Sequence, residues 1–381
     1  MSAVESALVV SHKFLTQPDD DLVIFLNSKE CSNVLHIRHS FSDAIDRCSY
    51  YTWYKKGKIC KEERTRDFGG LPEPFIYLKE FFFTLKWLLG SKIVWDVYVG
   101  MDGWCVFFGL AARFLGRVRK TIFWAIDFVP KDRFESGWKN KIYHFINIVG
   151  YKNADEMWDL SPRMAEARED FLGIREVNYK KHRVVPYGVW VDRIKKYSYE
   201  ECEKNTLVFM GHLLPKQGVQ LVIKAIPKIV KNISDFRFKI IGGGRYRPDL
   251  EKLAKELKVE KYCHFLGKLE DDRKLEDEIA RSCVAIAPYI KELDTWTYYA
   301  DPGKVKKYLA CGVPVLMTDL PWNAEEISEA GCGEIIFEDT SEVARAVVSL
   351  MNSDRSQEYR TKAREYAQRF NYTHIFGELD L

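Results

Sequence analysis

Short apolar runs alternate with segments of helical period along the whole chain. In the first half, the runs that predict strands are Ala7–Val10, Val34–Ile37, Ile93–Val99, Thr121–Ala125 and Glu156–Leu160. Apolar residues spaced every three or four positions predict the helices Pro72–Leu89, Gly103–Gly116, Lys139–Lys152 and Pro162–Phe171. Strands that alternate with helices form parallel sheets covered by helices, so this half is expected to be an α/β domain.

The same alternation of predicted strands and helices begins again after Pro186-Tyr187-Gly188. The expected strands are Thr206–Met210, Arg237–Ile241, Cys263–Leu266, Val284–Ala287 and Val313–Met317. The expected helices are Gly218–Ile233, Arg247–Leu257, Glu270–Arg281 and Lys304–Cys311. A chain of 381 residues fits two such domains. We expect one over residues 1–190, a second over 191–356, and a C-terminal segment 357–381 whose helix packs back toward the first.

Composition and charge narrow the class of protein. Hydrophobic residues make up 46% of the chain, which is ample for a large core. A net charge of only +3 argues against a nucleic-acid-binding protein. The nine cysteines form no CxxC pair, so neither a structural zinc nor a disulfide scaffold is expected, which suits a reducing cytoplasm. No signal-peptide pattern and no membrane-spanning run of about 20 apolar residues is evident.

The most apolar segment, Phe75–Gly90, has two interpretations. Its residues Phe75, Leu78, Phe81, Phe82, Leu85, Leu88 and Leu89 are spaced like a buried helix face. Phe83 and Trp87 lie off that face beside Lys79 and Lys86, which leaves an interfacial helix that docks on a membrane as the second interpretation. An excess of basic residues between 113 and 152 either meets an anionic surface or belongs to solvated helix faces.

The stretch around Lys304 carries the strongest chemical signal. Asp301-Pro302-Gly303-Lys304 predicts a turn that opens a helix, and Gly312 predicts the end of that helix. The first turn of a helix presents unpaired N–H groups and a positive dipole end, to which Lys304 adds a full charge. The pattern predicts a receptor for a diphosphate.

Two glycine-containing loops precede this stretch at strand ends. One runs from Gly211 to Gly218 and the other is Gly242-Gly243-Gly244. Ligands of parallel α/β sheets collect beyond the carboxyl ends of the strands, where all three segments are expected. Each loop alone is weak evidence, whereas the three in this order are more specific.

With these motifs, residues 185–338 resemble the donor domain of GT-B glycosyltransferases of the group-1, glycogen-synthase-like kind. The matching motifs are Pro186-Tyr187-Gly188-Val189, the loop from Gly211 to Gly218, Gly242–Gly244, Phe265-Leu266-Gly267 and residues 308–315. The first half is more divergent. Tyr298 followed by Ala300-Asp301-Pro302-Gly303-Lys304, with Asp127 in the other half, is also similar to xanthan-type glucuronosyltransferases.

The resemblance implies two Rossmann-like domains facing each other across a cleft. It implies a hexosyltransferase that moves a sugar from a nucleotide-diphosphate sugar (UDP favoured, GDP possible) to a hydroxyl of a glycan or lipid-linked acceptor at the cytoplasmic face, without metal or cofactor. Group-1 enzymes usually carry Arg and Lys where this chain has His212 and Gln217, and glutamates where it has Tyr299 and Lys307. These departures favour the xanthan-type variant, which inverts.

Two residues of the first half are expected to act in catalysis. Asp127, after a predicted strand, is the candidate general base, with a turn cap as its alternative role. His12 is expected to line the acceptor or donor cleft, with a histidine satisfied by nearby backbone as the alternative. The residues expected to bind the donor are Gly211, His212, Lys216, Gly243, Gly244, Tyr289, Tyr298, Asp301, Gly303, Lys304 and Lys307.

Two other functions stay open. A UDP-sugar 2-epimerase uses the same architecture but needs several acid/base groups around one sugar, and no such cluster is evident near Lys304. A non-catalytic nucleotide-sugar-binding protein is compatible with the altered positions His212 and Gln217.

Overall fold

A computed structural model describes residues 4–13, 18–40, 47–68, 70–129, 133–175, 178–293 and 297–381. The chain forms two compact units. Unit 1 comprises residues 1–186 and 375–381, and unit 2 comprises residues 187–374. The sequence prediction placed this division at 190/191. The predicted C-terminal segment is itself divided, because residues 357–374 belong to unit 2 and residues 375–381 to unit 1.

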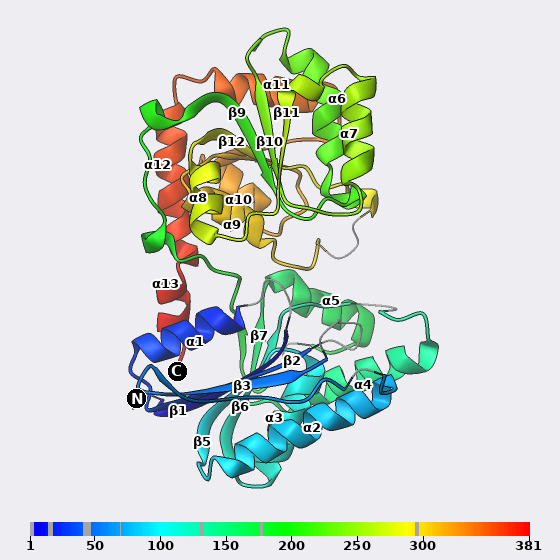
Figure 1. The fold of residues 1–381 in the computed structure, drawn as a ribbon, viewed down its shortest axis with the longest axis vertical. Helices are drawn as coiled ribbons and strands as arrows, with labels where there is room; N and C mark the ends of the chain where they lie inside the picture. The colour runs from blue at the N-terminus through cyan, green and yellow to red at the C-terminus, as the bar shows by residue number, and fades with distance from the viewer. Residues whose placement is uncertain are drawn as a thin grey trace. The chain divides into compact units, whose positions relative to one another are not determined.

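Unit 1 contains an eight-stranded sheet of order β4-β3-β2-β1-β5-β6-β7-β8. Its strands are β1 (Ser6–Lys13), β2 (Asn33–Ser40), β3 (Ser49–Lys55), β4 (Lys58–Arg64), β5 (Trp95–Gly100), β6 (Val118–Ala125), β7 (Glu156–Asp159) and β8 (His182–Val184). Its helices are α1 (Asp19–Ser28), α2 (Glu73–Gly90), α3 (Gly103–Phe114), α4 (Gly137–Asn153) and α5 (Pro162–Leu172). Within this unit, α2, α3 and α4 lie on one face of the sheet and α1 on the other (Figure 1).

The five strands predicted in this half are present, whereas the hairpin of β3 and β4 was not predicted. Both hairpin strands run antiparallel, so the sheet is mixed rather than wholly parallel. Lys56, with a φ of 47°, and Gly57, with a φ of 72°, form the two-residue turn that left-handed backbone favours in hairpins. Every residue of β4 is exposed, as suits a charged edge strand that resists further pairing.

Unit 2 contains a six-stranded sheet of order β11-β10-β9-β12-β13-β14, and all its pairs are parallel. Its strands are β9 (Glu203–Met210), β10 (Arg237–Ile241), β11 (Cys263–Gly267), β12 (Ser282–Ala287), β13 (Val315–Met317) and β14 (Gly333–Ile335). Its helices are α6 (Val219–Ile229), α7 (Arg247–Glu256), α8 (Asp272–Ala280), α9 (Gly303–Ala310), α10 (Ala324–Glu329), α11 (Thr340–Met351) and α12 (Ser356–Ala367). A short helix, α13 (Tyr372–Gly377), runs across the division between the units.

The core of unit 2 lies mainly between its sheet and the helices α6 and α11, which pack against each other. On the opposite face, α9 packs against α8 and α12 (Figure 1). Each strand predicted in this half is present, with bounds that differ by at most three residues. This order places the ends of β9, β10 and β12 side by side, and the three predicted donor loops follow β9, β10 and, further on, β12.

The prediction for the burial of α2 is wrong. Its buried residues are Ile76, Lys79, Glu80, Thr84, Trp87 and Leu88. Four residues of the predicted buried stripe (Phe75, Leu78, Phe82 and Leu89) are instead between 44% and 61% exposed. The helix is apolar on more than one side, so the spacing alone does not say which side faces the core. The buried side is the one that packs against the sheet and α3, because Trp87 and Leu88 belong to the same core cluster as residues of those elements.

Candidate functional site

In unit 2, the side chain of Lys304 meets the first glycine loop. Lys304, in the first turn of α9, donates a hydrogen bond from Nζ to Oε1 of Gln217. The same ammonium lies 4.4 Å from the ring centroid of Phe209 and 4.9 Å from that of Tyr289. A side chain at Gly211 would place its Cβ 2.9 Å from this Nζ. Lys304, Gly211 and Tyr289, which the sequence named separately, are therefore brought together.

The position of α9 is fixed by a buried tyrosine. The hydroxyl of Tyr308 accepts a hydrogen bond from the backbone N–H of Met210 at 2.6 Å and is 3.4 Å from the carbonyl oxygen of Ile286. Met210 ends β9 and Ile286 lies near the end of β12, so α9 is tied to the carboxyl edge of the sheet. This anchor holds the first turn of α9 where the loops after the two strands begin.

The two glycine loops are hydrogen-bonded to each other. The N–H of Gly211 donates to the carbonyl of Ile241, and the N–H of Leu213 donates to the carbonyl of Gly243, both at 2.9 Å. Gly242 has a φ of 130°, and a Cβ there would collide with the backbone of Gly211. At Gly243 a Cβ would meet nothing within 4 Å. Gly242 is therefore required by the packing of the loops, whereas Gly243 leaves open space above its backbone.

Asp301 lies in a closed polar network next to this group. Its carboxylate accepts hydrogen bonds from the backbone N–H of Tyr187 at 2.7 Å and from the indole N–H of Trp322 at 2.9 Å, and forms an ion pair with Lys306. Asp301 and Lys306 are both buried. These contacts hold the turn that precedes α9, which gives Asp301 a positioning role; its predicted contact with the sugar stays a prediction.

Other residues predicted to bind the donor have their own contacts in unit 2. Lys307 pairs with Glu276 of α8 at 2.7 Å. His212 is exposed, and the backbone carbonyl of Lys216 accepts a hydrogen bond from Ile290. Tyr298 is partly exposed and packs edge-on against Tyr299, with ring centroids 5.1 Å apart.

The other two glycines that were predicted to bind the donor, Gly303 and Gly244, differ in how much room a side chain would have. At Gly303, the start of α9, a Cβ would lie 3.8 Å from the side chain of Tyr187, an ordinary contact. At Gly244 a Cβ would collide with the backbone of Leu213, so this glycine belongs to the packing of the loops.

Sequence reasoning missed the role of Gln217. It was noted only as a departure from the family pattern, yet its amide oxygen receives Lys304. Phe209 was also missed as the aromatic ring beneath the ammonium. The sequence did offer a signal for Phe209. It is the last residue but one of the strand β9, which leads directly into the first glycine loop.

In unit 1, the predicted catalytic residue His12 lies between two carboxylates. His12 is the last residue but one of β1, at the carboxyl end of this interior strand. Its Nδ1 is 2.6 Å from Oδ2 of Asp102 and its Nε2 is 3.2 Å from Oε2 of Glu80. Burial lowers the pKa of His12, but the negative charges around it, led by Asp102, outweigh burial and hold that pKa well above 6.5. The ring is therefore cationic near neutral pH, and its predicted role in catalysis stays a prediction.

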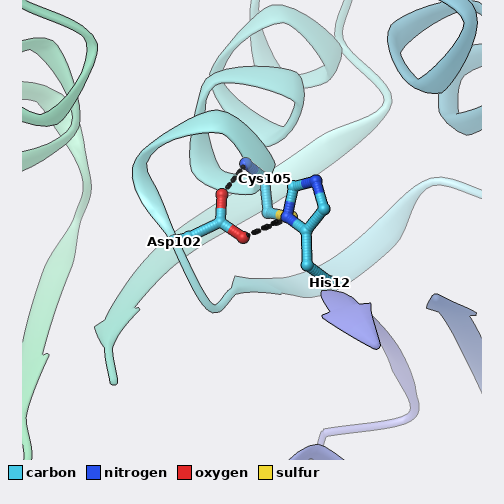
Figure 2. A group of neighbouring side chains, drawn as sticks. All are labelled: His12, Asp102 and Cys105. Atoms are coloured by element: carbon cyan, nitrogen blue, oxygen red, sulfur yellow. Dashed lines mark hydrogen bonds and ion pairs between the residues drawn. The ribbon is translucent and has the colours of Figure 1, made fainter. Parts of the chain in front are cut away.

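Asp102 and Cys105 complete a cluster with His12 (Figure 2). Asp102 is the N-cap of α3, where its Oδ1 accepts from the N–H of Cys105 at 2.8 Å. Its Oδ2 lies 3.1 Å from Sγ of Cys105, which in turn is 3.6 Å from Nδ1 of His12. No sequence pattern joined these residues, because 90 positions separate His12 from Asp102. The pairing of β1 with β5 brings their strand ends together.

Asp127, the predicted general base, follows β6. Its carboxylate is 45% exposed and is paired with Arg133 at 2.6 Å. Burial lowers the pKa of Arg133, but the charge of Asp127 outweighs burial and the net pKa is raised. The carboxylate is thus held in place at the carboxyl end of a strand and remains open to solvent.

Solved structures of other proteins share the fold of this chain. Solved structures similar over almost the whole chain include a sucrose-phosphate synthase from Thermosynechococcus elongatus, with a TM-score of 0.69 and 14% identity, covering 97% of this chain and 96% of that one. Another is HepE of Anabaena in complex with UDP, with a TM-score of 0.68 and 14% identity, covering 98% of each chain. The fold is GT-B, as the sequence resemblance predicted.

Part of the chain also matches a known family in sequence. Residues 204–353 match the family model described as glycosyl transferases group 1. A protein of Mycolicibacterium smegmatis named GDP-mannose-dependent alpha-(1-6)-phosphatidylinositol monomannoside mannosyltransferase is 23% identical over 186 residues, covering 45% of this chain and 47% of that protein. The chain spans between 22% and 62% of the length of the curated relatives it matches. Residues 204–353 therefore match the group 1 glycosyl transferases, and the described chain has the GT-B fold that the resemblance predicted.

Proposed function

We propose that this protein transfers a sugar from a nucleotide-diphosphate sugar to a lipid-linked acceptor. The observation that carries the first half of the proposal is the placement of Lys304. Its ammonium lies at the start of α9, among Gly211, Gln217 and Tyr289, where the loops after β9 and β10 meet. A diphosphate suits this place, because the first turn of the helix and a lysine both favour negative charge.

In this proposal, Lys304 stabilises the charge that develops on the departing nucleoside diphosphate. The open space above Gly243 leaves room for a phosphate to approach the backbone. Because a protein cation meets the charge, transfer is expected without added Mg²⁺. Asp127, exposed at the end of β6, is proposed to take the proton of the acceptor hydroxyl. An inverting outcome, as in xanthan-type enzymes, belongs to the same proposal.

Lys304→Met tests the donor half, because Met keeps most of the side-chain length without the charge. We expect the rate of transfer to fall by about 2–4 kcal/mol of transition-state stabilisation, as for a lost oxyanion donor. Lys228→Met is the matched control, since Lys228 donates hydrogen bonds to Thr340 and Ser341 at an exposed site on α6. An unchanged rate in Lys304→Met would remove the assignment.

Calorimetric titration with UDP and GDP identifies the nucleotide. The sequence favours UDP, whereas the names of several relatives state GDP-mannose. Turnover with a lipid extract then separates the functions: binding without transfer supports a nucleotide-sugar sensor, and conversion of the sugar without acceptor supports an epimerase. Asp127→Asn is expected to keep donor binding and lose transfer. Full activity of that variant would exclude Asp127 as the base.

The acceptor half of the proposal rests on the exposed face of the α2–α4 layer in unit 1. Four residues of α2 point to solvent, namely Phe75, Leu78, Phe82 and Leu89. Trp138, Ile142 and Phe145 of α4, spaced as one helix face, are between 49% and 63% exposed. Basic side chains on the same helices, such as the exposed Lys86 and Lys141, would attract an anionic bilayer surface.

In the described part of the chain, no helix has both the length and the apolar character needed to cross a bilayer. Docking on the surface is therefore the proposed mode of contact. Lys139 of α4 pairs with Glu73 of α2, so the two helices are held together at their N-terminal ends. A membrane at this face would present a lipid-linked acceptor to the enzyme.

Co-sedimentation with vesicles tests the docking face. Phe82 is 61% exposed, which for a side chain of about 200 Å² is about 120 Å². At about 25 cal/mol/Å² this area contributes at most about 3 kcal/mol, or about a hundredfold in partitioning. We expect Phe82→Ser to weaken binding to phosphatidylcholine vesicles that contain phosphatidylglycerol. Phe337→Ser, at a 72% exposed position of unit 2, is the control, and an equal loss in both variants would contradict the proposal.

A further inference from the structure

The cluster of His12, Asp102 and Cys105 has a set of donor atoms that suits a transition metal. It offers an imidazole nitrogen, a carboxylate oxygen and a thiol sulfur, all within 4.8 Å of one another. This combination of N, O and S donors is typical of Zn²⁺. Cys105 and His12 are buried, whereas the side chain of Asp102 is 26% exposed, so the cluster opens to solvent on the side of Asp102.

The distances between the donor atoms are close to those of a tetrahedral site. Zinc bonds of about 2.0–2.3 Å give ligand-to-ligand distances of about 3.3–3.7 Å in a tetrahedron. The distance from Sγ of Cys105 to Nδ1 of His12 is 3.6 Å, and that to Oδ2 of Asp102 is 3.1 Å. The pair of Nδ1 and Oδ2, 2.6 Å apart, must open by about 0.7 Å, and the pair of Sγ and Oδ2 by about 0.4 Å. A proton on Nδ1 accounts for the 2.6 Å distance.

The orientation of each ligand is already fixed by a second partner. Asp102 uses Oδ1 to cap α3, which leaves Oδ2 for the cluster (Figure 2). Glu80 of α2 lies 3.2 Å from Nε2 of His12 and can accept its proton. Histidines that bind metals usually donate their other ring N–H to a carboxylate, which keeps the metal-binding nitrogen unprotonated. Glu80 therefore supplies the outer contact that such a site requires.

An independent observation concerns the hydrogen bonding of Glu80. Among the described residues, Oε1 of Glu80 is buried and has no hydrogen-bond partner. Two carboxylates, those of Asp102 and Glu80, face one imidazole ring. A buried polar oxygen without a partner is costly, so this acceptor-rich group favours a cation.

We propose that unit 1 holds a divalent transition metal ion, with Zn²⁺ as its probe, through His12 Nδ1, Asp102 Oδ2 and Cys105 Sγ. Binding releases the proton of Nδ1 and the thiol proton of Cys105, because both atoms must present a lone pair to the metal. Three protein ligands leave a fourth position for water or an exogenous ligand. Binding of the metal does not require the group around Lys304 of unit 2, which is proposed to meet the diphosphate charge.

The test uses the full-length protein, stripped with a chelator under reducing conditions and titrated with Zn²⁺ against a chromophoric competitor. We expect one equivalent to bind, and Cys105→Ser and Asp102→Asn each to weaken binding at least tenfold. Co²⁺ is expected to give the near-ultraviolet absorption of a thiolate ligand, which Cys105→Ser abolishes. This absorption distinguishes a ligand from a residue that merely supports the fold.

Two matched controls address adventitious binding. Cys60→Ser removes an exposed thiol elsewhere in unit 1. Asp20→Asn disrupts a second group, Asp19, Asp20 and His36, whose donors also lie close together. Both variants are expected to bind one equivalent as the unaltered protein does. The proposal is overturned if no Zn²⁺ binds, or if binding survives in Cys105→Ser and is lost in a control.

Discussion

Asp301→Ala should destabilise unit 2 strongly. The carboxylate of Asp301 accepts from Tyr187 and Trp322 and pairs with Lys306 in a buried network. Its removal leaves a buried ammonium and two N–H groups without their acceptor. Breaking a buried ion pair by removing one partner costs about 3–5 kcal/mol, because the remaining charge is neither hydrated nor paired. We expect the free energy of unfolding of unit 2 to fall by about this amount.

A double variant separates the ion pair from the rest of the network. Asp301→Asn with Lys306→Met removes both charges and keeps an oxygen that can accept one of the two N–H groups. The loss in the double variant should therefore be smaller than the sum of the two single losses, by about 1–3 kcal/mol. Additive losses would mean that the two residues do not interact in the folded protein.

The loss in Asp301→Ala should also depend on pH. Burial lowers the pKa of Lys306 below 10.5 even though Asp301 opposes the shift, and without Asp301 that pKa falls further. Between the lowered pKa and 10.5, the unfolded chain binds a proton that the folded chain does not. The free energy of unfolding of Asp301→Ala should therefore rise with pH over this range.

Hydrogen exchange measured by mass spectrometry gives the local stability. The exchange rate of peptides that cover α9 is measured at increasing urea concentrations. The same variants are titrated with UDP-sugars and GDP-sugars. Faster exchange in Asp301→Ala at neutral pH supports the positioning role. Unaltered exchange together with lost nucleotide-sugar binding would refute it, and would favour the sequence-based prediction that Asp301 contacts the sugar.

Three further outcomes are expected. Gly242→Ala should cost about 1–3 kcal/mol in stability, because its φ of 130° is strained for other residues, whereas Gly243→Ala should keep stability and weaken donor binding. Gln217→Ala should weaken nucleotide binding in calorimetry, since the amide oxygen orients Lys304. Glu156→Gln should destabilise the protein at neutral pH in urea unfolding. Burial raises the pKa of Glu156, but hydrogen bonds, first from two neighbouring lysines, outweigh burial and lower it, so its contribution is present above about pH 4.3 and is lost as pH falls through the lower folded pKa.

Each outcome has a result that contradicts it. Equal stability of the two glycine variants would mean that the contact between the loops is not essential. Normal nucleotide affinity in Gln217→Ala would mean that Lys304 is positioned by other groups. A constant difference between wild type and Glu156→Gln from neutral to acidic pH would show that the charge of Glu156 is not the cause.

The sequence by itself determined the succession of strands and helices and the two-part organisation, and it placed Lys304 in the first turn of a helix of unit 2, where a diphosphate site is proposed. These features are encoded locally or repeat along the chain. Apolar runs predict strands, and glycines predict turns. The pair Pro302-Gly303 predicts the start of the helix whose first turn contains Lys304. Parallel strand order then places the following loops at one edge, so Lys304 and Gly211 were expected near each other. The hairpin of β3 and β4 was missed because β4 is polar and every residue of it is exposed.

Only the tertiary structure decided which side of α2 is buried and which side chains meet in unit 1. Phe75 and Phe82 fit a buried face as well as Trp87 does, and packing against α3 and the sheet selects among faces that periodicity leaves equal. His12 meets Asp102 because β1 pairs with β5, a contact between distant segments that no local pattern encodes. Asp301 likewise had the residue type of a sugar ligand, and only the structure showed that it is buried against Lys306. Local sequence sets each element, whereas the choice among competing faces and partners depends on the total surface that the assembled fold can bury.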